Sequence, residues 1–145
     1  MQYSRFSFFA ADGLMLYYCM SDLLLDINLQ QLPDDYLAGH WQVASRVLNQ
    51  NNPASPLALA TRLQLNPGQL LAEAPGLPEA AAGTWAVQRD ELLQRPYLRF
   101  NLPQEQTNAL VTRLRRSADG QHSQLNLYFA SGMEMQLEQS EFPRL

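Results

Sequence analysis

Residues 123–137 read SQLNLYFASGMEMQL, and both the loop and the strand pairing of this stretch can be derived from its residue pattern. Two runs of alternating apolar and polar residues flank a small-residue turn that ends in Gly132, which is typical of a β-hairpin. A two-residue loop would set apolar side chains opposite charged or polar ones. A three-residue loop at 130–132 instead sets apolar opposite apolar, pairing Leu125 with Leu137, Leu127 with Met135 and Phe129 with Met133. The three-residue loop is therefore predicted, with Gly132 left-handed.

Residues 4–18, SRFSFFAADGLMLYY, follow the same pattern and predict a second hairpin near the N-terminus. The same loop geometry places one face of this hairpin on a core. The other face is also largely apolar, since it carries Phe9, Met15 and Tyr17 beside Cys19. If this face is open to solvent it is typical of a partner-binding surface, and if a helix covers it the sheet is buried on both sides.

Between the hairpins the apolar spacing predicts helices, strands and loops in turn. Asp34 to Leu48 and Pro103 to Ser117 carry apolar stripes at helical spacing. A short helical hairpin is expected over 56–71, and strands are expected over 23–29, 84–89 and 97–101. The sequence thus predicts an α+β fold, an antiparallel sheet of N- and C-terminal hairpins packed against two main helices. The chain, 1–145, is expected to form a single domain, with 73–83 as an exposed connector.

Composition restricts the chemistry that this chain can perform. The net charge is −4, all ten basic residues are arginine, and the absence of lysine excludes Schiff-base chemistry. The single cysteine, Cys19, excludes an intrachain disulfide and favours a reducing compartment. The apolar stretch 6–20 is interrupted by Asp12 and Gly13, so neither a signal peptide nor a membrane span is expected. A cytoplasmic location without membrane contact is predicted.

Two segments suggest nucleic-acid binding. Residues 59–71, LATRLQLNPGQLL, have leucine and alanine spacing that resembles a helix-turn-helix, although the second helix would carry no arginine or lysine for phosphate contact. Residues 89–116 hold six arginines against three acidic residues. The anion or nucleic-acid contacts expected from this stretch are Arg99, Arg113, Arg115 and Arg116. A helical hairpin that serves only for packing is the structural alternative for 59–71. For the arginines it is the solvated C-terminal end of a helix, where the helix dipole favours cations.

Catalytic and metal-binding patterns do not emerge from the sequence. His40 and His122 lie in no metal-ligand spacing with Cys19 or a carboxylate, and no phosphate loop or nucleophile elbow occurs. No enzyme activity, cofactor or metal is therefore predicted, although a site at His40 or Cys19 would show as a pocket around either residue.

The function expected from these observations is non-enzymatic. A bacterial-type regulatory, adaptor or chaperone-like protein would bind another protein, or itself, through Phe9, Met15 and Tyr17. The alternative is a nucleic-acid-binding regulator that uses 59–71 and the arginine-rich stretch 89–116.

Overall fold

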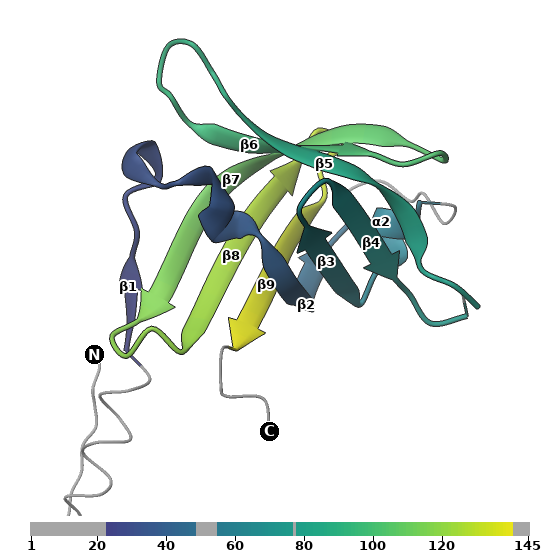
Figure 1. The fold of residues 1–145 in the computed structure, drawn as a ribbon, viewed down its shortest axis with the longest axis horizontal. Coiled ribbons are helices and arrows are strands. Elements are labelled where there is room, and N and C mark those ends of the chain that lie inside the picture. Colours follow the sequence, from purple (N-terminus) through teal and green to yellow (C-terminus); the bar gives the residue numbers. More distant parts are fainter. Residues whose placement is uncertain (1–22, 49–54, 77, 141–145) are drawn as a thin grey trace, which may run out of the picture.

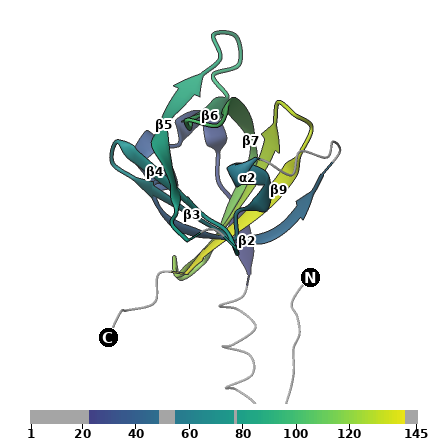
Figure 2. The same cartoon turned by 90° about the vertical axis from the view of Figure 1, so that its right-hand side faces the viewer.

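The computed structural model describes residues 23–48, 55–76 and 78–140, and these residues form an antiparallel β-barrel (Figures 1 and 2). The strands are β1 (Leu24–Asp26), β2 (Gly39–Val47), β3 (Arg62–Asn66), β4 (Gln69–Glu73), β5 (Ala81–Arg89), β6 (Pro96–Asn101), β7 (Gln106–Ser117), β8 (His122–Phe129) and β9 (Glu134–Ser140). Two short 3₁₀ helices, η1 (Leu29–Gln31) and η2 (Asp34–Leu37), precede β2, and one α-helix, α2 (Pro56–Leu59), follows it.

The strands from β2 to β9 form an up-and-down barrel. Each of them pairs with the next strand in the chain, and β9 pairs back with β2, so that eight strands close into a ring. Strand β1 is not part of this ring. It pairs with the C-terminal part of β7, whereas β6 pairs with the N-terminal part of β7. No helix in the described ranges is long and apolar enough to cross a membrane.

This barrel corrects the predicted α+β fold. The segment predicted as a helix over 34–48 forms η2 and β2, and the segment predicted as a helix over 103–117 is mainly β7. Each of these strands contains a β-bulge, at Ala44 in β2 and at Thr112 in β7, where the pairing register shifts by one residue. Because of the bulge, successive inward side chains are two residues apart and then three residues apart. This resembles the spacing of the side chains on one face of a helix.

Other predicted elements are confirmed. Strands β5 and β6 contain the predicted segments 84–89 and 97–101, and β1 lies within 23–29. The β8–β9 hairpin has the predicted register, with Leu125 opposite Leu137 and Leu127 opposite Met135. Its loop is closed by a hydrogen bond from Phe129 N to Met133 O of 2.8 Å, and Gly132 has φ of 94°. The N-terminal hairpin predicted over 4–18 lies outside the described residues.

The barrel interior is filled with apolar side chains. The largest fully buried ones include Trp41, Phe100 and Phe129, surrounded by leucines and Met135 from the inward positions of the strands. An eight-stranded barrel is just wide enough for side chains to fill its interior or for one small ligand to bind there. Here the side chains occupy it.

Different segments cover the two ends of the barrel. At one end, residues 27–38, hereafter the strap, run from β1 to β2 and bury Leu32 and Leu37. At the other end lies α2, with Leu57 and Ala58 buried. The predicted connector 73–83 includes the turn between β4 and β5, at the same end as α2, and its last three residues begin β5.

Candidate binding surface at the strap end

The strap is fixed to the barrel by buried contacts. Leu37 is fully buried, and its carbonyl accepts a 2.9 Å hydrogen bond from the indole Nε1 of Trp41 on β2. Tyr36, the preceding residue, is half-exposed, and its ring centroid lies 4.9 Å from the guanidinium of Arg116. Apolar burial and a cation–π contact thus hold the strap over this end of the barrel.

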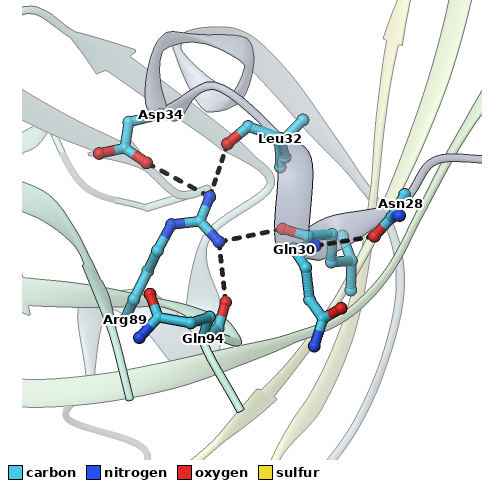
Figure 3. A network of polar contacts seen from close by, with 7 residues as sticks. Asn28, Gln30, Leu32, Asp34, Arg89 and Gln94 are labelled. Carbon is cyan, nitrogen blue, oxygen red and sulfur yellow. Dashed lines mark hydrogen bonds and ion pairs between the residues drawn. The ribbon is translucent and has the colours of Figure 1, made fainter. Parts of the chain in front are cut away.

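Arg89, the last residue of β5, joins the strap to the β5–β6 loop (Figure 3). Its Nη1 donates to Leu29 O at 3.0 Å and to Gln94 O at 2.9 Å. Its Nη2 donates to Leu32 O at 2.5 Å and lies 3.5 Å from Asp34 Oδ1. One half-buried guanidinium therefore binds three backbone carbonyls and one carboxylate, from two segments far apart in the sequence.

The β5–β6 loop, residues 90–95 and hereafter the tip loop, is held in one conformation by its own hydrogen bonds. Asp90 Oδ1 accepts from Leu93 N at 2.5 Å, and Asp90 O accepts from Gln94 N at 3.2 Å. Gln94 is left-handed, with φ of 56°. The loop also contacts the strap, since Gln30 Nε2 donates to Leu93 O at 2.9 Å. These bonds indicate a preorganised loop.

The tip loop presents two apolar side chains to solvent. Leu92 is 92% exposed and Leu93 is 53% exposed, and Figure 1 shows that the β5–β6 hairpin projects beyond its neighbouring strands. Acidic side chains lie at the same end of the barrel. They are Glu91 in the loop and Asp34 and Asp35 in the strap, and all three are exposed. An exposed apolar anchor on a rigid loop resembles the residues that dominate protein–protein interfaces.

The predicted partner-binding residues Phe9, Met15 and Tyr17 lie outside the described residues, as does Cys19. The structure therefore says nothing of the aromatic hairpin face.

The four arginines predicted to contact an anion lie on the adjacent strands β6 and β7, and each contacts another side chain of the described residues. Arg99 is exposed on β6 and donates to Gln88 Oε1 at 3.4 Å. Arg113 makes a bidentate ion pair with Asp26, at 2.8 and 3.3 Å. Arg115 on the same strand donates to Gln124 Oε1. Arg116 faces Tyr36 at the strap end, opposite Ser123 in register.

The segment predicted as a helix-turn-helix, residues 59–71, contains no pair of helices. After α2 it forms β3 and most of β4, joined by a tight turn at Pro67 and Gly68, with Gly68 at φ of 72°. The sequence signal for this hairpin was the Asn-Pro-Gly turn, together with alternate burial of Leu63 and Leu65. The correction removes the recognition helix on which DNA reading would depend.

The two histidines lie on different strands of the barrel. His40 is exposed on β2 opposite Gln64, and His122 is half-buried at the start of β8. Among the described residues no three His, Cys, Asp or Glu side chains are close enough to hold a metal ion.

The tip loop was not singled out from the sequence, although the signal was present. Leu92 and Leu93 follow Asp90 and Glu91 in a turn between two predicted strands. Apolar residues in a short hairpin loop have no route into a core, so their exposure can be inferred once the two strands are assigned.

A small recess lies at the opposite end, between α2 and the β8–β9 loop. Its volume is about 60 Å³, and buried Leu57, Phe129 and Met133 line it beside Ser55 and Glu105. Ser55 Oγ hydrogen-bonds Glu105 Oε1, and Arg46 Nη1 donates to Ala58 O, so that α2 is held over the recess. This volume is well below the few hundred Å³ typical of sites for drug-sized ligands.

Comparisons with known protein families, with curated proteins and with solved structures found no match.

Proposed function

We propose that this chain is a non-enzymatic binding module of the regulatory or adaptor type, which docks onto another protein through Leu92 and Leu93 of the tip loop. The observation that carries the proposal is the 92% exposure of Leu92 on a loop fixed by Asp90, Arg89 and Gln30. Binding a preordered loop costs little conformational entropy, so little of the free energy gained by burying a leucine is lost in ordering the loop. The filled barrel interior also favours function at the outer surface.

A quantitative capture experiment tests this function. The full chain and the double variant Leu92→Ser, Leu93→Ser are immobilised in parallel and exposed to native lysate treated with nuclease. Leu59→Ser is the matched control, because Leu59 is 44% exposed on α2 at the opposite end of the barrel. We expect a stoichiometric protein partner with the wild type and the control, and affinity lower by about 30-fold with the double variant. Equal capture by all three, or no captured protein, would refute the proposal.

A further inference from the structure

A shallow polar groove runs over the outer face of the barrel, across β2, β9, β8 and β7. Its volume is about 400 Å³, within the range of small-molecule sites. Seven side chains with polar groups line it, from strands that are neighbours in the sheet: Ser45, Arg46, Thr112, Asn126, Tyr128, Glu134 and Gln136.

The two β-bulges lie on the strands that flank this groove. Ala44 is the extra residue of β2, and Thr112 is the extra residue of β7. A bulge bends its strand and increases the local twist, and bulges are frequent beside functional sites. The β8–β9 pair lies between these bent strands, which accounts for a concave region on a sheet surface.

The polar groups of the groove are largely free of partners within the described chain. Thr112 Oγ1 donates to Asn126 O at 3.2 Å, whereas the side chains of Ser45, Glu134 and Gln136 make no hydrogen bond there. Asn126 Oδ1 is buried and has no hydrogen-bond partner. This oxygen has no accessible surface, so a ligand in the groove would instead contact the polar atoms of Ser45, Glu134 and Gln136.

Tyr128 adds an aromatic surface to these polar groups. It is 46% exposed and lies opposite Glu134 in register, while Asn126 lies opposite Gln136 one step along the same hairpin. A flat aromatic ring therefore lies beside two amides, a carboxylate and a hydroxyl. The aliphatic face of a sugar ring packs well on such a ring, and planar amides and carboxylates bond to adjacent hydroxyls.

We propose that this groove is a binding site for a neutral saccharide of one or two residues, with Tyr128 as the stacking platform. Glu134 and Gln136 would bond the sugar hydroxyls, beside the hydroxyl of Ser45. Of the two charged groups that line the groove, Arg46 is half-buried and bonds Ala58 O, whereas Glu134 is exposed. The exposed carboxylate therefore disfavours sugars that carry a carboxylate. The site is independent of the tip loop, which joins β5 to β6 at the strap end of the barrel, whereas the groove lies on β2, β9, β8 and β7.

The test is a two-dimensional NMR titration of the isotope-labelled full chain. The probes are glucose, galactose, mannose and N-acetylglucosamine, cellobiose, maltose and lactose, and sialic acid as an acidic sugar. We expect saturable shifts from at least one neutral probe at Asn126, Tyr128 and Gln136, and at least tenfold weaker binding of sialic acid. Absence of saturable shifts with every neutral probe, or shifts that centre elsewhere, would overturn the proposal.

Variants separate stacking from general effects on the fold. Tyr128→Ala should weaken binding at least tenfold, Tyr128→Phe should retain most of it, and Gln136→Ala should weaken it without touching the aromatic ring. Tyr36→Ala is the matched control, because Tyr36 is 43% exposed at the strap end. Spectra of each free variant report whether it folds. Unchanged affinity in folded Tyr128→Ala or in Gln136→Ala would contradict the assigned roles.

Discussion

Arg89 is the residue whose loss should cost the barrel most among its charged side chains. Replacing it by methionine keeps most of the side-chain volume but removes the donors to Leu29 O, Leu32 O and Gln94 O. These carbonyls would lose a charged partner in a part-buried place, so we expect a loss of about 2–3 kcal/mol in the free energy of unfolding. Urea denaturation measures it. Arg95→Met, an exposed neighbour in the tip loop, should change stability by less than about 0.5 kcal/mol.

Replacing each of two glycines by alanine tests how closely the backbone at that position is packed. A Cβ on Gly83 would lie 2.1 Å from Asn101 O and 2.8 Å from Leu102 Cδ2. The first of these is a backbone atom of the paired strand β6, which cannot easily move away. Gly83→Ala should therefore lower the free energy of unfolding by about 2–3 kcal/mol. A Cβ on Gly68 would meet nothing within 4 Å, so Gly68→Ala should cost only its left-handed strain, about 1 kcal/mol. Equal thermal midpoints for the two variants would contradict this reading.

At the scale of elements, the β8–β9 hairpin was predictable and the two long strands with bulges were not. The hairpin pattern is local: one loop length sets apolar residues opposite apolar residues, and the structure has that register. In β7 the buried residues Ala109, Val111 and Leu114 follow a spacing of two and then three because Thr112 is inserted. This spacing predicted a helix. The β-branched Thr107, Val111 and Thr112 favoured a strand, and the periodicity outweighed them.

The candidate sites were less accessible to sequence reasoning than the elements. The polar groove depends on pairing between β9 and β2, which joins segments about 90 residues apart and leaves no local pattern. Arg89 similarly acts on a strap some 55 to 60 residues earlier in the chain. Such contacts follow only from the closed topology, whereas the apolar pair Leu92 and Leu93 could have been recognised from the turn alone.

The β7–β8 turn carries a carboxylate that should make stability depend on pH. The hydroxyl of Ser117 donates to Asp119 Oδ1 at 2.5 Å, and Gln121 N donates to the same oxygen at 2.9 Å; these bonds hold the pKa of Asp119 below its usual value. The unfolded chain therefore binds a proton more readily than the folded one, and this stabilising contribution is present above about pH 4 and lost as pH falls further. Asp119→Asn keeps the acceptor oxygen and removes the titration. The urea midpoint of Asp119→Asn should fall less than that of the wild type between pH 5 and pH 3, a range of about one unit on either side of pH 4.

At the scale of the whole molecule, the closed ring should unfold as one unit. Trp41 is buried on β2 under the strap, and Trp85 is half-exposed on β5, with its Nε1 donating to Asn66 O at 2.6 Å. Fluorescence of these residues and far-UV circular dichroism should give the same denaturation midpoint, because a ring of paired strands has no part that stands alone. Separate midpoints would show that the barrel contains two cooperative units.

Closure by the β2–β9 pairing also has a consequence for the way the protein is made. Strand β2 is synthesised before β3 to β8, and its partner β9 follows them. While these six strands are being made, the edge of β2 that faces β9 lacks its partner, and unpaired edges are templates for aggregation. A chain whose translation stops before β9 therefore cannot close the barrel, even if its other strands pair correctly.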